Sequence, residues 1–344
     1  MVWSAGGLVR QEVGRSFRTL HVEFALHAVE RWAMLPSGSL TSFSVLAPAK
    51  INLWLRVLGR REDGFHELKT RMVPLDLCDR LTLTVNGMLE AGTIEFSCDD
   101  PSVPCDESNL VVKAVRVLER ATGLLPGMRL HLEKQIPHGA GLGGGSSDAA
   151  AALRLVRHAF CQDLTNATLH EAAAAVGSDI PFFLLGGVAD ASGRGEQLVP
   201  VPDFMATPRM LLVKLPFGVA TPWAYRQWRD SLTVPGLPYA PQSTEIGELF
   251  NDLECPVFEK YQVLGHLKAL LLATPGVKAA LMSGSGSTIF ALLEESVDAA
   301  SIAVRVTDEV GREVRLIATR PAPGLFPIIS PAEATPLSAT DVAL

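Results

Sequence analysis

The residues with the clearest chemical potential are the glycines of the string PHGAGLGGGSSDAAAAL. Five of the seven residues from 139 to 145 are glycine. Amides without side chains in front of them can close on phosphate oxygens, and a helix start adds unpaired N–H groups and partial positive charge. The string therefore predicts an anion-binding loop, with tight helix–strand packing or a flexible connection as the alternative.

The spacing in this loop separates it from two familiar nucleotide motifs. No Gly-Lys-Ser/Thr follows, so it is not a Walker loop. Gly139, Gly141 and Gly144 match the dinucleotide motif G-x-G-x-x-G. A dinucleotide site also requires a second strand that ends about 20 residues further on, but here residues 161–166 follow a helix. Next come two serines whose hydroxyls suit phosphate, magnesium or simple helix capping, and Asp148, interpreted as an ordinary cap.

Two charged residues are candidates for proton transfer. Asp179, in GSDIPFF, is a candidate general base if a cation keeps it ionised, and otherwise caps the segment that follows. Lys50, flanked by Ala49 and Ile51 in APAKINL, is the candidate cation, with a snorkelling edge lysine as the alternative.

A turn supplies a possible base-binding pair. Asp63-Gly64 is typical of a hairpin turn, and it is followed by Phe65-His66. An aromatic ring followed by a histidine can stack a base and hydrogen-bond to its edge, although most histidines so placed are ordinary surface residues.

The pattern around these residues predicts the elements that must position them. Residues 43–59 read as two strand segments flanking a bend at Pro48, and residues 81–85 and 94–98 as further strands. Ser108 is predicted to cap a helix that Gly123 ends. Alternation over residues 128–132 predicts a strand before the glycine loop, and apolar spacing from Ala149 to Phe160 predicts a helix after it.

The second half of the chain yields a coarser pattern. A helix is expected over about 168–176, and three prolines in the string LVPVPDFMATP place a domain boundary near residue 200. Beyond it we expect a strand over 210–215 and a helix around 223–229. Residues 1–43 are an unassigned extension, and the Pro/Ala/Thr-rich residues 321–344 read as a loose tail.

Composition excludes several classes of protein. The 344 residues carry 30 Lys and Arg against 37 Asp and Glu, a net charge of −7, which gives no overall field for a nucleic acid. No apolar run is long enough to span a bilayer, and no export signal is recognised. The five cysteines are scattered and form no C-x-x-C pair, so we expect a cytoplasmic protein with no nucleic-acid or membrane partner.

Taken in order, four strings resemble the GHMP kinase superfamily. APAKINLWLRVLGRREDGFHELKT resembles its opening motif, IPHGAGLGGGSSDAAAAL its ATP loop, GSDIPFFLLGG its catalytic segment and MSGSGSTIFAL its C-terminal glycine motif. PAKINL together with DGFH and GSDIPFF is similar to the branch of the superfamily that acts on a cytidine diphosphate sugar alcohol.

This resemblance implies a role for each matching position. Lys50 and Asp179 match a catalytic pair, in which the aspartate takes the proton of the acceptor hydroxyl. The implied substrate-binding residues are Asn52, Phe65, His66, Thr221 and Tyr225. The implied ATP-binding residues are Asn109, Leu110, Gly139, Gly141, Leu142, Gly143, Gly144, Gly145, Ser146 and Ser147. The metal ligands stay unassigned.

The resemblance also implies the fold and the reaction. The expected class is α+β, in the two-domain GHMP kinase fold: a ribosomal protein S5 domain 2-like ATP-binding domain over residues 44–200 and a ferredoxin-like domain over 201–320. ATP and Mg²⁺ are the expected cofactors, the partner is a small-molecule substrate, and the protein is a monomer or homodimer. The alternatives are a kinase acting on mevalonate or homoserine, a dinucleotide oxidoreductase, and a non-catalytic nucleotide-binding regulator.

Overall fold

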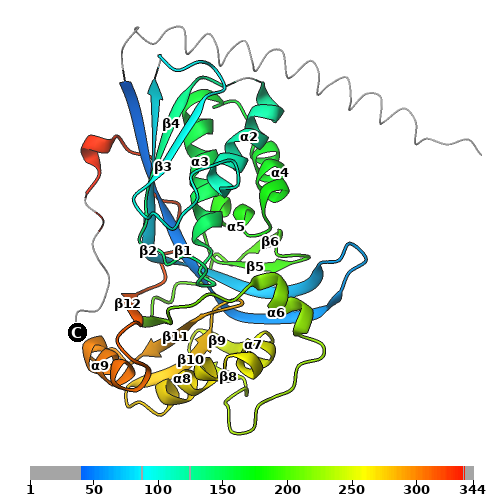
Figure 1. Ribbon diagram of the computed structural model, residues 1–344, viewed down its shortest axis with the longest axis vertical. Helices are drawn as coiled ribbons and strands as arrows, with labels where there is room; N and C mark the ends of the chain where they lie inside the picture. Colours follow the sequence, from blue (N-terminus) through cyan, green and yellow to red (C-terminus); the bar gives the residue numbers. More distant parts are fainter. Residues whose placement is uncertain (1–39, 87, 124, 336, 338–344) are drawn as a thin grey trace, which may run out of the picture.

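The computed structural model describes residues 40–86, 88–123, 125–335 and 337. Within these residues the chain forms two β-sheets that pack face to face, with helices on the outer side of each (Figure 1). The α+β class is therefore confirmed. Nearly all of the predicted N-terminal extension, residues 1–39, lies outside the described residues.

A long antiparallel hairpin organises the first sheet, which has eight strands in the described part of the chain. Its strands are β1 (Leu40–Arg60), β2 (His66–Asn86), β3 (Ile94–Cys98), β4 (Met128–Glu133), β5 (Ala189–Ser192), β6 (Gln197–Pro200), β8 (Gln242–Thr244) and β9 (Gly247–Asn251). The turn predicted at Asp63-Gly64 joins β1 to β2. The predicted break at Pro48 is wrong: the register shifts between Pro48 and Lys50, because a proline that cannot donate to the ladder is absorbed by a bulge.

Four helices cover the outer face of this sheet: α2 (Leu110–Thr122), α3 (Gly144–Phe160), α4 (Asn166–Val176) and α5 (Ile180–Leu185). The residue that caps α2 is Asn109, whose side chain accepts from the amide of Val111, so the cap predicted at Ser108 is wrong by one residue. Gly123 ends α2 as predicted. No helix in the described ranges is both long and apolar enough to cross a membrane.

The second sheet consists of β7 (Met210–Lys214), β10 (Val277–Met282), β11 (Thr288–Leu293) and β12 (Arg315–Thr319). The helices of this half are α6 (Thr221–Gln227), α7 (Glu254–Lys260), α8 (Gln262–Leu272) and α9 (Ala299–Val310). Its strand order is β10-β11-β7-β12, all antiparallel. This is the order of a ferredoxin-like β-α-β-β-α-β unit, as expected.

Three apolar clusters fill the layers. One lies between the first sheet and α2–α5, one between the two sheets, and one between the second sheet and α6–α9. Strand β7 is apolar over residues 210–213 because both of its faces are buried. Leu211 and Val213 face the helices, whereas Met210 and Leu212 face the first sheet. The two halves are thereby joined by a shared core.

Two features cross the predicted domain limits, which remain a prediction. Strand β9 pairs in parallel with β1 through Trp54 and Leu55, so a segment of the second half completes the first sheet. The tail expected to be loose is bonded to the first sheet up to the short 3₁₀ helix η1 (Pro331–Glu333). These are backbone hydrogen bonds, which need no apolar periodicity in the sequence.

Candidate active site

A cleft of about 940 Å³ draws its lining from both halves of the chain. All but one of the predicted site residues line it: Lys50, Asn52, Phe65, His66, Asn109, Leu110, Gly139, Gly141, Leu142, Gly143, Gly144, Gly145, Ser146, Asp179, Thr221 and Tyr225. The exception is Ser147, whose side chain is buried behind the loop, where its hydroxyl has no hydrogen-bond partner among the described residues.

The glycine loop occupies the predicted junction between β4 and α3. Gly143 is the N-cap of α3 in a left-handed conformation, φ 71°, and no side chain in the described residues caps the first amides. Those N–H groups are therefore available to an anion. Gly141, φ 77°, admits no side chain, since a Cβ there would lie 2.2 Å from the carbonyl oxygen of Ser283. At this point the backbone of the loop therefore packs directly against the C-terminal glycine motif.

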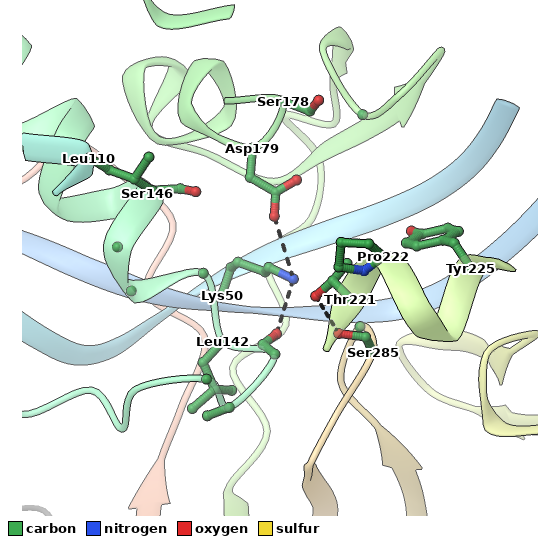
Figure 2. Close-up of a pocket in the computed structure, with 18 of the residues that line it drawn as sticks. Lys50, Leu110, Leu142, Ser146, Ser178, Asp179, Thr221, Pro222, Tyr225 and Ser285 are labelled. Carbon is green, nitrogen blue, oxygen red and sulfur yellow. Dashed lines mark hydrogen bonds and ion pairs between the residues drawn. The ribbon is translucent and has the colours of Figure 1, made fainter. Parts of the chain in front are cut away.

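Lys50 and Asp179 face one another in the cleft (Figure 2). Lys50 Nζ lies 3.9 Å from Asp179 Oδ2, and the lysine side chain is 6% exposed against 38% for the aspartate. Figure 2 shows the pair between Leu110 and Ser146 on one side and Thr221 and Tyr225 on the other. The two predicted catalytic residues are therefore together, between the predicted nucleotide and acceptor ends.

Hydrogen bonds fix the position of the lysine. Lys50 Nζ donates to Asn52 Oδ1 at 2.7 Å and to the carbonyl oxygen of Gly141 at 3.1 Å. Asn52 Nδ2 in turn donates to Thr70 Oγ1 at 2.8 Å, and that hydroxyl donates to the carbonyl oxygen of Trp54. Burial lowers the pKa of Lys50 below its ordinary 10.5, and the charge of Asp179 raises it part of the way back.

Aromatic side chains gather at the opposite end of the cleft. The rings of His66 and Tyr225 lie 5.5 Å apart, tilted by 31°, and Trp228 meets His66 edge-on at 6.5 Å. Partial burial and the nearby charge of Arg60 lower the pKa of His66, which favours the neutral ring. Phe65 is 51% exposed on the rim of the cleft. A flat, polar-edged group suits this end.

The nucleotide end is bounded by Asn109 and Leu110 at the start of α2. The side chain of Asn109 is committed at both ends, because Oδ1 accepts from Val111 and Nδ2 donates to the carbonyl oxygen of Pro104. Leu110 lies 3.6 Å from the position a Cβ would take on Gly145, so it borders the loop. Both predicted residues line the cleft, and the asparagine side chain caps α2, while their contact with a nucleotide stays a prediction.

Lys134, which was not predicted as a site residue, lies beneath the loop in a buried ionic cluster. Its Nζ is 2.5 Å from Asp79 Oδ2 and 3.0 Å from Asp148 Oδ2. Burial alone would lower the pKa of Lys134, but the two carboxylates raise it. The predicted capping role of Asp148 is wrong, because its side chain points to this lysine from inside α3. Buried and exposed residues alternate along β4, and continuing this alternation by one residue makes position 134 a buried one. This pattern could have identified Lys134 from the sequence.

Two further residues of the cleft were missed. Ser285 is hydrogen-bonded to Thr221 at 2.8 Å and joins the C-terminal glycine motif to α6; the motif was recognised but no residue in it was assigned. Arg194 lies in the β5–β6 turn with its guanidinium 4.8 Å from the ring of Phe65. Nothing in the local sequence of that turn identifies the arginine.

Comparisons with known proteins agree with this geometry. Residues 109–187 match the family model of the GHMP kinases N terminal domain, and residues 240–312 that of the GHMP kinases C terminal. A 4-diphosphocytidyl-2-C-methyl-D-erythritol kinase from Methylacidiphilum infernorum is 45% identical over 263 residues, 76% of this chain and 89% of that protein. The chain belongs to the 4-diphosphocytidyl-2-C-methyl-D-erythritol kinase family. The enzyme of the same name from Gloeobacter violaceus is 38% identical over 80% of this chain and 94% of its own.

Solved structures support the same family. A crystal structure of a 4-(cytidine 5'-diphospho)-2C-methyl-D-erythritol kinase matches with a TM-score of 0.64 and 35% identity, covering 81% of this chain and 99% of that one. A homoserine kinase from Cytophaga hutchinsonii matches with a TM-score of 0.59 at 18% identity, a likeness of fold alone. The expected GHMP kinase fold is confirmed.

Proposed function

We propose that this chain catalyses the ATP-dependent phosphorylation of the 2-hydroxyl of 4-diphosphocytidyl-2-C-methyl-D-erythritol, giving the 2-phosphate and ADP in the non-mevalonate route to isoprenoid precursors. The observation that carries the proposal is the Lys50–Asp179 pair, which lies in one cleft between a phosphate-binding type of loop and an aromatic pocket. Relatives that this chain matches over most of its length bear the corresponding name.

The acceptor side of the reaction rests on Asp179 and Lys50. An ammonium group has three donors, and two of those on Lys50 are used by Asn52 and Gly141. The 3.9 Å between Lys50 and Asp179 exceeds hydrogen-bond distance, so an acceptor hydroxyl placed between them would meet the third donor and the carboxylate. Asp179 then accepts the hydroxyl proton as the oxygen attacks the phosphoryl group.

The phosphoryl side rests on the glycine loop. The transferred group passes through a loose transition state with charge spread over its equatorial oxygens, so positioning and charge stabilisation dominate. The residues at the start of α3, whose first amides have no side-chain cap among the described residues, line the cleft together with Lys50, so these amides can meet that charge. We therefore propose that the β- and γ-phosphates of ATP bind along residues 141–146, with the adenine beside Leu110.

Magnesium is proposed as a phosphate-bound ion. In the described ranges no three His, Cys, Asp or Glu side chains are grouped to hold a metal by themselves. Mg²⁺ commonly binds through substrate phosphates and one or two protein oxygens, and Ser146, whose hydroxyl could serve as one of these, lines the cleft. When bound, the ion would neutralise charge on the transferred phosphate.

The acceptor identity rests on the aromatic end of the cleft. Cytosine would lie near Phe65, His66 and Tyr225, with Asn52 and Thr221 facing the sugar alcohol. A kinase for mevalonate or homoserine needs no such pocket. A calorimetric titration with CDP alone distinguishes a kinase for the cytidine-linked acceptor from a kinase for mevalonate or homoserine. Saturable CDP binding that mevalonate does not displace supports the proposal, and absence of CDP binding opposes it. Cytoplasmic location and a monomeric or homodimeric state stay predictions.

A further inference from the structure

The chain after β12 crosses the outside of the first sheet, and we term residues 321–335 the C-terminal strap. The amide of Ala322 donates to the carbonyl oxygen of Pro74 at 2.9 Å, and Ser44 and Ile329 exchange two backbone bonds of 2.8 and 2.9 Å. Figure 1 shows this orange-to-red end of the chain beside β1 and β2. The strap lies outside the match to the GHMP kinases C terminal family model, which ends at residue 312.

The middle of the strap rests on α5 and α3. Leu325 lies so close to Gly186 that a Cβ on this glycine would be 2.1 Å from Leu325 Cγ. The carbonyl oxygen of Phe326 accepts a hydrogen bond of 2.5 Å from Arg154, on α3. Burial lowers the pKa of that guanidinium, so a carbonyl partner supplied by the strap compensates part of its lost hydration.

The elements under the strap are the ones that carry the catalytic pair. Pro48, two residues before Lys50, and Phe183 of α5 line the small cavity beneath Leu325, which shares no residue with the active-site cleft. Asp179 is the N-cap of α5, and within the described residues its side chain makes no capping bond, so its position depends on the position of α5. On its other side Phe183 abuts the glycine loop, 2.9 Å from where a Cβ on Gly143 would lie.

We propose that the strap is a positioning element for phosphoryl transfer: by pressing on α5 and β1 from outside the cleft, it holds Asp179 and Lys50 at their working separation. The inference rests on the proposed function of the same site. Leu325 is 50% exposed, so its side chain packs against the elements beneath the strap on one side only. Misplacement of a reacting group by about 1 Å can cost about 100-fold in rate, whereas binding contacts made elsewhere in the cleft persist.

Truncation after Arg320 tests this proposal. We expect kcat to fall about 10- to 100-fold while the KM values for ATP and the cytidine-linked acceptor change less than about threefold. Truncation after Thr335, which keeps the strap, is the control and should match the full chain. A synthetic peptide of residues 321–335 added to the shorter protein should restore turnover. An unchanged kcat, or a folded truncated protein that the peptide does not rescue, would overturn the proposal.

A point variant covers the case in which the truncated chain does not fold. Leu325→Ala should lower kcat about three- to tenfold at unchanged KM, because the loss of one contact should displace the reacting groups by less than the loss of the whole strap. Leu232→Ala, at a leucine 72% exposed and away from the cleft, is the matched control. Equal kcat in both variants would refute the positioning role. The full chain is assayed in parallel, because its inactivity on the cytidine-linked acceptor would reject the proposed function itself.

Discussion

Replacing Asp179 by asparagine removes the base and the charge while nearly preserving the shape of the side chain. Two unit charges 3.9 Å apart attract by about 4 kcal/mol at an effective dielectric constant of 20 and by about 1 kcal/mol in water. Asp179 is 38% exposed, so solvent screens the pair and the lower figure applies. Loss of the ion pair alone would therefore slow the reaction less than about tenfold, since a factor of ten corresponds to about 1.4 kcal/mol.

Loss of a general base has a larger effect. Positioned proton transfer contributes about 10²- to 10⁴-fold, so Asp179→Asn should lower kcat at least about 100-fold, or about 2.7 kcal/mol of activation free energy. The affinity for CDP and for ATP should change little, because the aromatic pocket and the glycine loop are untouched. Single-turnover rates from rapid-quench measurements, together with calorimetric Kd values, separate the two effects.

The matched control is Asp190→Asn. Asp190 is similarly exposed, at 36%, but it pairs with Arg71 outside the cleft. Its variant should keep normal turnover. If Asp179→Asn loses less than about tenfold in kcat, the assignment of Asp179 as the base is refuted and only its charge matters.

Three other predictions concern the pH profile, the aromatic pocket and a buried ion pair of the second half. Burial lowers the pKa of Lys50 and the charge of Asp179 raises it part of the way back, so the alkaline limb of the pH–rate profile should fall at a pH below 10.5. Asp179→Asn should move the alkaline limb of its residual activity to still lower pH. An alkaline limb that stays in place would contradict the pairing of Lys50 with Asp179. Phe65→Ala should weaken CDP binding by about 1–3 kcal/mol, the usual worth of one base-stacking contact, whereas Phe65→Tyr should bind normally; calorimetry that finds no loss in the alanine variant removes the stacking role. Lys268 Nζ lies 2.6 Å from Glu254 Oε2 with both side chains buried, whereas Lys278 pairs with Glu245 at the surface. Lys268→Met leaves the buried carboxylate of Glu254 without its partner and should cost about 3–5 kcal/mol of unfolding free energy in urea melts, against less than about 1 kcal/mol for Lys278→Met. Equal losses in the two variants would contradict this effect of burial.

Local signals explain what the sequence alone could predict. The glycine loop is contiguous, and its strand and helix neighbours show clear periods, so its place in the fold followed from a short window. Lys50 and Asp179 each looked unusual in their own strings, which suggested a base and its cation, and the family resemblance implied the same pair. No short window shows that they meet, since they lie on β1 and before α5. Periodicity within one segment carries no information about which segments meet.

The missed features depend on contacts between distant segments. The buried lysine beneath the loop is neutralised by carboxylates from β2 and α3, which no single window contains. The strap lacks any apolar period because backbone bonds and one leucine hold it, so its proline-rich sequence read as a loose tail. The start of α2 could not be predicted to the residue, because Ser108 and Asn109 are both residue types that cap helices well. In the structure Asn109 is the cap, and its side-chain Nδ2 also donates to the carbonyl oxygen of Pro104, a contact outside the helix.

The central claim is that one cleft transfers phosphate from ATP to a cytidine-linked methylerythritol through Asp179. The most direct measurement is coupled ADP release from the full chain with three acceptors in parallel: the cytidine diphosphate methylerythritol, mevalonate and homoserine, with the product position confirmed by phosphorus NMR. We predict turnover of the first, with the new phosphate on the 2-hydroxyl, and only background ADP release with the other two. Preference for mevalonate or homoserine, or a phosphate found at another position, would contradict the account.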